Sequence, residues 1–317
     1  LTSGGDAPGM NAAIRAVVRT GINNGIEVVG IRKGYEGLMN ADIKTLEGKN
    51  VSDIINRGGT ILHTARCLEM LTPEGQEKAA KIYKVLGLDG LIVIGGDGSF
   101  RGCQALAKHG VNCIGIPATI DLDMNCTEYT IGFDTAVNTG TEAINKLRDT
   151  SSSHERCSVV EVMGRDAGYI AIWCAMAGGA EEVLLPEEKD MINNERVIKQ
   201  ILENRSLGKR HNLIVVAEGV GGSQKLAKDI QETTGIQTRA TILGHLQRGG
   251  NPTALDRMHA SIMGYKAVQA LMAGERTRVV VYNQGQYGTM DIEEALTMQK
   301  RYDAELYDIV KTLAVSK

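Results

Sequence analysis

Short apolar runs rich in β-branched residues recur along the chain, and segments with apolar residues at helical spacing lie between them. Strands that are apolar on both faces and alternate with helices build mostly parallel sheets. The predicted strands are Glu27–Ile31, Gly90–Ile94, Cys113–Ile116, Ser158–Val162, Glu182–Leu185, Asn212–Ala217 and Val279–Tyr282. The predicted helices are Gly9–Asn23, Gly75–Leu86, Ala136–Thr150 and Glu195–Leu202. The alternation therefore predicts an α/β fold.

A chain of 317 residues is long enough for one large or two medium domains. We expect two Rossmann-like, three-layer α/β lobes with mostly parallel sheets, the second beginning near Gly132. The first lobe would comprise residues 1–131 and roughly 252–300, and the second residues 132–251. Residues 301–317 would form a C-terminal helical segment. The abrupt start at Leu1 suggests that a first strand has been cut short.

The composition narrows the class of protein. The 35 Lys and Arg nearly balance the 38 Asp and Glu, which argues against a nucleic-acid or polybasic membrane surface. The six cysteines form no CxxC pair and no zinc spacing, so we expect reduced thiols. The longest apolar run, Ile170–Ala177, is too short to span a bilayer, and no signal segment opens the chain. These features predict a cytoplasmic protein.

Ligands of open α/β sheets gather beyond the carboxyl ends of the strands, so the loops after the predicted strands are candidate site segments. Gly95-Gly-Asp-Gly-Ser99 is one such loop. Its glycines allow close backbone approach, and amides that lead into a helix attract anions. Asp97 would repel a bare phosphate but fits if Mg²⁺ lies between carboxylate and phosphate. A plain glycine-rich turn with Asp97 as a helix cap is an equal alternative, and the P-loop signature is absent.

Asp121 and Asp123 follow another predicted strand, with Leu122 between them. Strand alternation would direct both carboxylates to one side and Leu122 to the other. One acid could accept a proton from a hydroxyl nucleophile while the other orients a metal or the first acid. An Asx-type turn at a strand end is the alternative that the stretch alone favours. If the acids are functional, we expect them to face the same cavity as the Gly95–Ser99 loop.

Basic residues also recur in loop contexts, and guanidinium groups match phosphate oxygens in a bidentate manner. Each alone is more often a solvated surface charge. The candidates are Arg66, Arg156, Arg165, Arg239, His245 and Arg248. A metal-binding acid, a base, a phosphate cradle and several arginines together are typical of phosphoryl transfer to a hydroxyl.

Several longer motifs carry a family resemblance. TSGGDAPGMNAAIR, INRGGT, GGDGS, TIDxD, RDTSSSHER, VEVMGR, AEG and GHxQRGG occur here in the order found in bacterial ATP-dependent 6-phosphofructokinases. The chain resembles this family (type A) over nearly its whole length. The resemblance implies a homotetramer of two-lobed subunits that transfers the γ-phosphoryl group of ATP to the C1 hydroxyl of fructose 6-phosphate. It also implies that the first lobe binds ATP and the second the sugar phosphate.

The resemblance assigns roles to residues at matching motif positions. Asp121 would be the general base, with Thr119 and Asp123 beside it, Arg165 the cation at the transition state and Asp97 the Mg²⁺ ligand. The implied ATP contacts are Gly5, Tyr35, Arg66, Cys67, Gly96, Asp97, Gly98 and Ser99. The implied sugar-phosphate contacts are Thr119, Asp121, Met163, Gly164, Arg165, Glu218, His245 and Arg248, with Arg156 and Arg239 reaching in from a neighbouring subunit.

The resemblance also implies an effector site at a subunit interface, where ADP or GDP activates and phosphoenolpyruvate inhibits. Its residues would be Arg15, Arg19, Arg148, Gly179, Glu181, Lys209, Arg210 and His211. From the sequence alone, Arg15 and Arg19 are more simply an exposed i,i+4 pair on a helix face.

Small residues at Gly98 and Ala118 favour ATP over pyrophosphate, whose users tend to carry Asp and Lys at these positions. The chain departs from the family pattern at Leu122, where asparagine is usual, and at Tyr169, where an acid is common. Gly48 and Leu207 replace basic effector contacts, the latter in a loop about two residues longer than expected. Leu122 bears on turnover, and Gly48 and Leu207 bear on the effector response.

Two alternatives belong to other classes. An NAD(P)-dependent oxidoreductase could use GDGSFRG as its glycine-rich turn and Asp121, about twenty residues on, as its ribose acid. A catalytically weakened subunit could instead bind nucleotide or sugar phosphate as a sensor. A related sugar phosphate, such as tagatose 6-phosphate, is an alternative substrate for the kinase.

Overall fold

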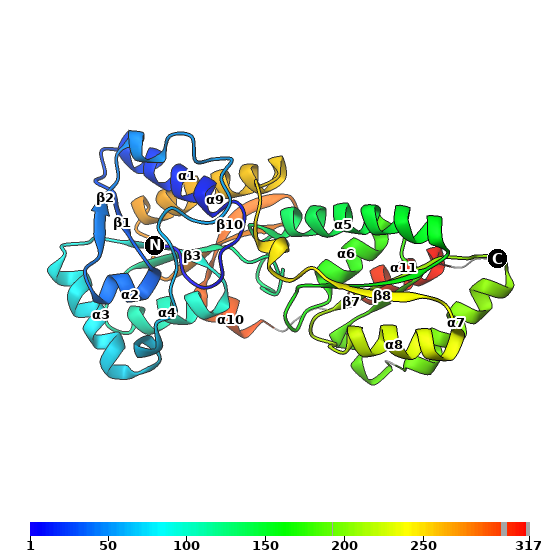
Figure 1. Cartoon of the computed structure of the whole chain (residues 1–317). Coiled ribbons are helices and arrows are strands. Elements are labelled where there is room, and N and C mark those ends of the chain that lie inside the picture. Colours follow the sequence, from blue (N-terminus) through cyan, green and yellow to red (C-terminus); the bar gives the residue numbers. More distant parts are fainter. Residues whose placement is uncertain (192, 299–302, 315–317) are drawn as a thin grey trace. The chain divides into compact units, whose positions relative to one another are not determined.

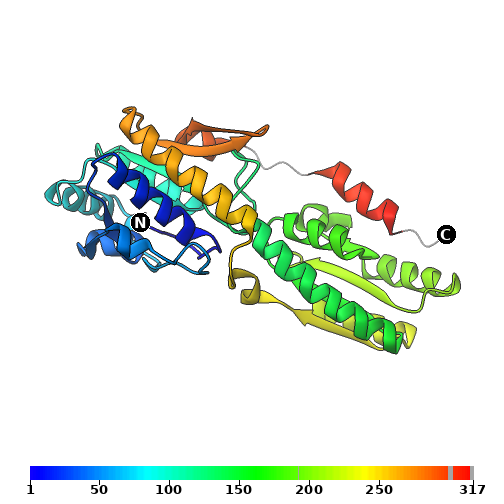
Figure 2. The same ribbon diagram turned by 90° about the horizontal axis from the view of Figure 1, so that it is seen from above.

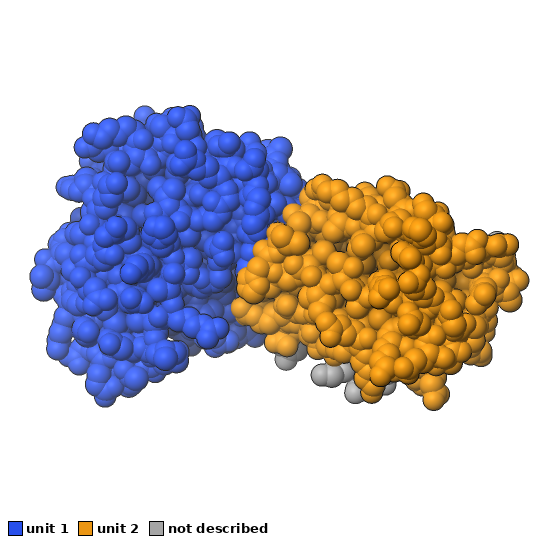
Figure 3. All heavy atoms as spheres, in the orientation of Figure 1, with its two compact units in different colours: residues 1–120, 124–135, 248–300 blue, residues 121–123, 136–247, 301–317 orange. Residues whose placement is uncertain are grey.

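The computed structural model describes residues 1–191, 193–298 and 303–314, which form two compact units, coloured separately in Figure 3. Unit 1 contains Leu1–Ile120, Met124–Thr135 and, of the C-terminal part, residues 248–298. Unit 2 contains Asp121–Asp123, Ala136–Gln247 and residues 303–314. Asp121–Asp123 thus belong to unit 2, although unit 1 residues flank them in sequence. The last part of the chain, which we expected as a separate segment, is grouped with unit 2.

Unit 1 is built on a four-stranded sheet of order β10-β9-β4-β3. β3 (Leu91–Gly95), β4 (Cys113–Pro117) and β9 (Arg278–Asn283) are parallel, and β10 (Gln286–Asp291) is antiparallel to β9. β1 (Val29–Ile31) and β2 (Ile43–Thr45) form a separate antiparallel pair. The helices are α1 (Met10–Asn23), α2 (Gly34–Met39), α3 (Pro73–Val85), α4 (Asp97–Ala107), α9 (Ala254–Met272) and α10 (Ile292–Thr297), with 3₁₀ turns η1 (Gly48–Val51) and η2 (Leu68–Leu71).

Helices cover both faces of the unit 1 sheet (Figure 1). α1 and α9 pack side by side on one face, and α3, α4 and α10 lie on the other. The core beneath α4 includes Phe100, which is fully buried and lies against Gly115 of β4. A side chain at Gly115 would need the space of the Phe100 ring, since an added Cβ would lie 2.6 Å from it. Unit 1 is therefore a three-layer α/β sandwich.

Unit 2 is built on a fully parallel sheet of order β6-β7-β5-β8. Its strands are β5 (Cys157–Val162), β6 (Glu182–Leu184), β7 (Asn212–Ala217) and β8 (Thr238–Ile242). Its helices are α5 (Phe133–His154, whose first turn belongs to unit 1), α6 (Tyr169–Gly178), α7 (Asn194–Ser206), α8 (Ser223–Thr234) and α11 (Ala304–Leu313), with 3₁₀ turns η3 (Pro186–Met191) and η4 (Gly244–Arg248). Figure 1 shows α5 and α6 on one face and α7 and α8 on the other.

These two sandwiches confirm the predicted α/β fold with mostly parallel sheets. All seven predicted strands are present, and β7 matches its prediction at both ends. β1 is shorter than expected because it begins at Val29 rather than Glu27. Three strands were not predicted, namely β2, β8 and β10. Among the described residues, no helix is both long and apolar enough to cross a membrane.

Candidate active site

The glycine-rich loop after β3 leads directly into α4, as predicted. Gly95 ends the strand, and α4 begins at Asp97 without a side-chain cap on its first amides. An added Cβ at Gly95 would lie 2.5 Å from the carbonyl oxygen of Ser3, so only glycine fits there. The Ser99 hydroxyl is buried and has no hydrogen-bond partner in the described part of the chain. The loop therefore offers uncapped amides and an unused hydroxyl, which together suit an anion.

Thr119 lies beside this loop because β3 and β4 are neighbouring parallel strands. Gly95 pairs with Pro117, and the Ala118 amide donates to the Gly95 carbonyl at 2.9 Å. A Cβ at Gly96 would be 3.7 Å from the Thr119 Cβ. The Thr119 carbonyl accepts a 2.7 Å hydrogen bond from the Thr130 hydroxyl, which fixes the chain after β4. Unit 1 thus brings Thr119 and Gly96 together.

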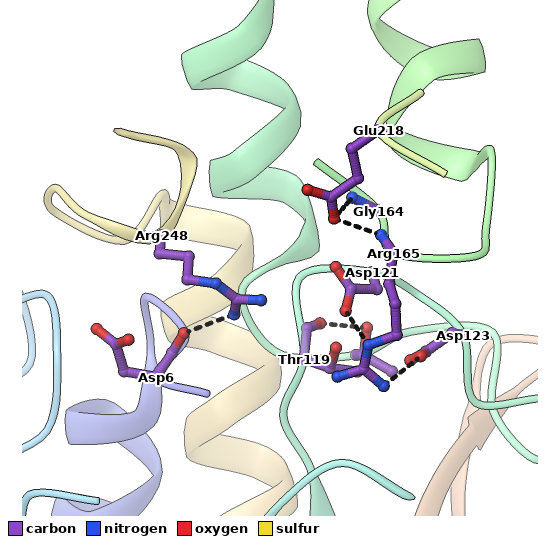
Figure 4. Close-up of polar contacts among 9 residues, drawn as sticks. Asp6, Thr119, Asp121, Asp123, Gly164, Arg165, Glu218 and Arg248 are labelled. Atoms are coloured by element: carbon purple, nitrogen blue, oxygen red, sulfur yellow. Dashed lines mark hydrogen bonds and ion pairs between the residues drawn. The ribbon is translucent and has the colours of Figure 1, made fainter. Parts of the chain in front are cut away.

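Asp121 and Asp123 share one arginine in unit 2. Arg165 Nε lies 4.0 Å from Asp121 Oδ2, and Arg165 Nη1 lies 3.5 Å from Asp123 Oδ2 (Figure 4). Only 1% of the Asp121 side chain is exposed, against 63% for Arg165. Burying a carboxylate is costly unless a positive charge compensates it. The Arg165 guanidinium supplies that charge beside the buried Asp121 carboxyl group.

The prediction that strand alternation aligns the two acids is wrong. β4 ends at Pro117, and Leu122 adopts a left-handed conformation with φ of +51°. Asp121 and Asp123 therefore lie in a turn, and Arg165 brings their side chains together. Asparagine tolerates this conformation better than leucine does, because its short polar side chain bonds locally. The asparagine that the resemblance makes usual at position 122 would therefore adopt this turn at a lower cost than Leu122 does.

A glutamate organises the loop that carries Arg165. Glu218 follows β7, and its Oε1 accepts hydrogen bonds from the amides of Gly164 at 3.2 Å and Arg165 at 2.7 Å (Figure 4). Gly164 has φ of +141°, and a Cβ there would lie 2.4 Å from the Ala167 carbonyl oxygen. Arg165 itself has φ of +53°. The loop is thus held in a conformation that ordinary residues adopt at a cost.

Gln247 supports the candidate site through the loop after β5, and the sequence analysis did not single it out. It is fully buried, and its Oε1 accepts a 2.8 Å hydrogen bond from the Met163 amide. Its Nε2 donates to the Ala136 carbonyl oxygen at 3.1 Å. It therefore ties the loop after β5 to α5. Its place inside the GHxQRGG motif, between His245 and Arg248, was the signal that could have identified it.

Arg248 belongs to unit 1 and lies against the N-terminal glycine loop. Its Nη1 donates to the Asp6 carbonyl oxygen at 3.3 Å (Figure 4). A Cβ at Gly5 would lie 2.7 Å from the same nitrogen, so glycine makes room for the guanidinium. Tyr35 is buried and donates to the Ser99 carbonyl at 2.5 Å. Burial raises the pKa of Tyr35 well above its ordinary value, so it remains a neutral donor.

The remaining predicted ATP and sugar-phosphate contacts make no described contact with the Gly95–Ser99 loop, the two aspartates or the Gly164 loop. Arg66 and His245 are exposed, and the Cys67 thiol faces Met39 Sδ at 3.6 Å. Arg156 precedes β5, and Arg239 pairs with Ser158 near the start of the same strand. Both arginines thus lie at the amino end of the unit 2 sheet, whereas the Gly164 loop and Glu218 lie at its carboxyl end. Arg156 Nε donates instead to Gln237 Oε1 at 2.6 Å.

The predicted effector residues of unit 2 gather at the amino end of its sheet. Arg148 Nη2 donates to the carbonyl oxygens of Gly178 and Gly179, the latter at 2.6 Å. Glu181 is buried and pairs with Lys209 Nζ at 2.6 Å. The remaining predicted residues are Arg210, which pairs with Glu155 at 3.0 Å, half-buried His211, and Arg15 and Arg19 on α1 of unit 1.

The residues present fit Mg²⁺ only as a partner of a bound phosphate. Among the described residues, no three His, Cys, Asp or Glu side chains gather to hold a metal. Mg²⁺ is commonly held by one or two carboxylates plus substrate phosphates, with water completing the octahedron. Half-buried Asp97, in the first turn of α4, meets that requirement.

Comparisons with known proteins agree on one family. The phosphofructokinase family model matches residues 1–271. An ATP-dependent 6-phosphofructokinase of Clostridium botulinum (strain Loch Maree / Type A3) is 59% identical over 314 residues, which are 99% of this chain and 98% of that protein. A phosphofructokinase structure from Saccharomyces cerevisiae has a TM-score of 0.84 at 34% identity and covers 93% of this chain. The Pichia pastoris phosphofructokinase in the T-state has a TM-score of 0.87 at 32% identity and covers all of it. This chain spans 44% and 36% of those two yeast chains.

Proposed function

This chain belongs to the phosphofructokinase family and is a kinase with an alcohol group as acceptor, and we propose that it is an ATP-dependent 6-phosphofructokinase. It would transfer the γ-phosphoryl group of ATP to the C1 hydroxyl of fructose 6-phosphate, giving fructose 1,6-bisphosphate and ADP in glycolysis. The observation that carries the proposal is the buried Asp121 carboxylate beside the Arg165 guanidinium. Because the chain belongs to a kinase family, the glycine-rich turn is no longer evidence for an NAD(P)-dependent oxidoreductase.

The proposed mechanism assigns Asp121 the role of general base. The C1 oxygen attacks the γ-phosphorus while its proton passes to Asp121, and the bond to the β,γ-bridging oxygen breaks as ADP leaves. Buried bases of this kind typically contribute a factor of about 10²–10⁴ in rate. Arg165 is mostly exposed, so its guanidinium can turn toward transferring phosphoryl oxygens. Asp123 and the Glu218 clamp on the Arg165 amide would limit that movement.

The nucleotide would bind over the start of α4. Ser99 and the uncapped amides suit its phosphates, and Gly98 is exposed with nothing within 4 Å of an added Cβ. That open space favours ATP over pyrophosphate as the donor. When Mg²⁺ is bound with the nucleotide, Asp97 would hold it, and the ion would neutralise charge on the phosphates.

We further propose that the sugar phosphate is held by the loop of Met163 and Gly164, by Glu218, His245 and Arg248, and by Arg156 and Arg239 of a neighbouring subunit. The position of those last two arginines at the opposite end of the unit 2 sheet supports a contribution in trans. We propose the homotetramer that the family resemblance implies as the assembly that supplies it.

The cluster around Arg148, Glu181 and Lys209 is the proposed effector site for ADP or GDP and for phosphoenolpyruvate. The resemblance gives basic effector contacts at positions 48 and 207, where this chain has Gly48 and Leu207, so we expect a weak response. A cytoplasmic location is also proposed, because all six cysteines are free thiols.

A donor and acceptor panel tests the proposal. Initial rates of ADP release are measured with ATP and fructose 6-phosphate, then with pyrophosphate as donor and tagatose 6-phosphate as acceptor. We expect the highest kcat/KM with ATP and fructose 6-phosphate. Nucleotide binding without sugar-dependent ADP release would favour the sensor alternative instead, and a preference for pyrophosphate would contradict the donor assignment.

A further inference from the structure

A second glutamate, Glu187, holds the chain just after Arg165, and none of the roles assigned above uses it. Glu187 lies in η3, which follows β6. Its Oε1 accepts a 2.8 Å hydrogen bond from the amide of Gly168, the residue that precedes α6. Gly168 has no side chain with which to cap this helix. The Glu187 carboxylate therefore caps α6 from another element, at a helix end that favours negative charge.

The contact between Glu187 and Gly168 is close and specific. An added Cβ at Gly168 would lie 2.7 Å from Glu187 Oε2 and 2.7 Å from Leu185 Cδ2, so glycine makes room for the carboxylate. Glu187 Oε2 is buried and has no hydrogen-bond partner among the described residues. Within that part of the chain, the Gly168 amide is the only hydrogen-bond donor to Glu187. This single contact therefore fixes the carboxylate.

The segment from Gly164 to Gly168 is thus held at both ends by a glutamate. At its start, Glu218 accepts hydrogen bonds from the amides of Gly164 and Arg165, at 3.2 and 2.7 Å (Figure 4). At its end, Glu187 accepts from the Gly168 amide. The backbone of Arg165 lies between these two attachments.

The neighbours of the two glutamates also meet at Arg165. Gly219 follows Glu218, and an added Cβ there would lie 2.4 Å from the Arg165 carbonyl oxygen. The same Cβ would lie 3.2 Å from Cβ of Pro186, the residue before Glu187. Close packing of this kind transmits a displacement instead of absorbing it. A shift of either glutamate segment would therefore reach the Arg165 backbone.

Arg165 needs this support because its backbone is strained. Its φ of +53° lies in a region that residues other than glycine adopt at a cost, and such conformations persist only where the surrounding contacts enforce them. Loss of the Glu187 contact would let the segment relax. The guanidinium would then leave its place beside Asp121 and Asp123.

We propose that Glu187 is a positioning residue for phosphoryl transfer. It fixes the segment from Gly164 to Gly168, and so it keeps the Arg165 guanidinium where it can meet the transferring phosphoryl group. Glu187 touches no reacting atom and acts through Arg165 alone. This inference rests on the proposed function, in which Arg165 stabilises the transition state.

Trypsin cleavage after Arg165 tests the positioning role without relying on enzyme activity. Cleavage of a native loop requires local opening, so its rate follows the open population. Glu187→Ala removes a hydrogen bond to a charged group and should speed cleavage at the Arg165–Asp166 bond by roughly tenfold or more. Glu187→Gln should be cleaved nearly as slowly as the wild type, because its amide oxygen still accepts from Gly168. Cleavage after Arg276, at an exposed position of unit 1, should be unchanged in both variants.

A double-mutant cycle tests whether Glu187 acts through Arg165. With ATP and fructose 6-phosphate, Glu187→Ala should lower kcat by about tenfold or more and leave the KM for ATP nearly unchanged, whereas Glu187→Gln should stay within about threefold of the wild type. In an Arg165→Gln background, Glu187→Ala should lower kcat by less than about twofold further, because the group that it positions is already absent.

Glu188→Ala is the matched control. Glu188 is also half-buried, and its carboxylate forms no hydrogen bond or ion pair with a described residue, so its kcat and its cleavage after Arg165 should match the wild type. Unchanged cleavage after Arg165 in Glu187→Ala, equally faster cleavage after Arg276, or an undiminished loss of kcat in the Arg165→Gln background would each overturn the positioning role. A wild-type protein without sugar-dependent ADP release would instead contradict the proposed function, and the cleavage rates would still decide whether Glu187 fixes the segment.

Discussion

At the scale of single residues, Gly164 carries the sharpest steric constraint in the candidate site. Its φ of +141° lies in a region that essentially only glycine visits, and a Cβ would lie 2.4 Å from the Ala167 carbonyl oxygen. We expect Gly164→Ala to displace the Arg165 amide from Glu218 and to lower kcat by more than tenfold. The strain and the clash should together cost about 1–3 kcal/mol of unfolding free energy, measured by urea titration.

Gly222→Ala is the matched control for this substitution. Gly222 also has positive φ, at +74°, but nothing lies within 4 Å of its added Cβ. We expect it to cost about 1 kcal/mol and to leave kcat nearly unchanged. Equal losses of kcat in the two variants would show that the Gly164 loop has no special part in the site.

Single residues also show how far the sequence predicts the site. The position of the GGDGS segment, at a strand end that leads into a helix, was predicted correctly because its glycines and acid form a recognisable local pattern. The geometry of Asp121 and Asp123 was predicted wrongly. The prediction assumed that side chains alternate as in a strand, but Leu122 has a left-handed backbone conformation that breaks this alternation. Gln247 was missed because its two hydrogen bonds reach residues 84 and 111 positions away, which no local pattern reveals.

At the scale of elements, Asp256 on α9 caps the start of α5. Its carboxylate accepts hydrogen bonds from the Tyr129 hydroxyl and the Gly132 amide, both at 2.7 Å, and from the amide and hydroxyl of Thr135. Asp256→Ala would leave these buried donors unsatisfied, at about 1–3 kcal/mol each where water cannot enter. We expect a loss of several kcal/mol in urea unfolding. Asp291→Ala, which removes the cap of α10, should cost only about 1 kcal/mol.

The same carboxyl group should leave a signature in the pH dependence of stability. Burial raises the pKa of Asp256 above its ordinary value of 3.8. Because the folded pKa is the higher one, the folded state holds a proton that the unfolded chain has lost, and stability falls as pH rises through that interval. Asp256→Asn should lack this fall, so the stability difference should shift in favour of the variant as pH rises above about 3.8. If the difference in unfolding free energy between the wild type and Asp256→Asn did not change with pH, the prediction of a raised Asp256 pKa would be wrong.

Element prediction succeeded where apolar periodicity was strong and failed elsewhere. β7 is buried throughout and was predicted with both ends correct. β2 is exposed at all three positions and β10 is largely polar, so neither shows an apolar pattern, and each depends on pairing with a neighbour. α6 is apolar on nearly every side because it is buried, which erases the helical period. α8 does show helical spacing in Leu226, Ala227 and Ile230, a signal that the sequence analysis did not use.

At the scale of the whole molecule, the reactivity of the six free thiols toward a labelling reagent measures two things. The buried thiols measure folding, and Cys67 tests for nucleotide binding. Cys67 is half-buried and the other five are buried. Burial raises the pKa of Cys126 to about 11 and of Cys157 and Cys174 to about 12, so these thiols stay protonated at neutral pH. We expect a maleimide to label Cys67 alone in the native protein and all six cysteines in urea. Saturating ATP should slow Cys67 labelling if Cys67 is one of the ATP contacts that the family resemblance implies, and an unchanged rate would contradict that assignment.

The replacement of Asp121 by asparagine tests the central claim most directly, because it keeps the shape of the side chain and removes the proton acceptor. Steady-state kinetics with ATP and fructose 6-phosphate would compare Asp121→Asn with the wild type and with Asp149→Asn, which changes an exposed aspartate on α5. We predict that kcat falls by about 10²–10⁴ only in Asp121→Asn, while the KM for fructose 6-phosphate changes little. A kcat within twofold of the wild type would contradict the account.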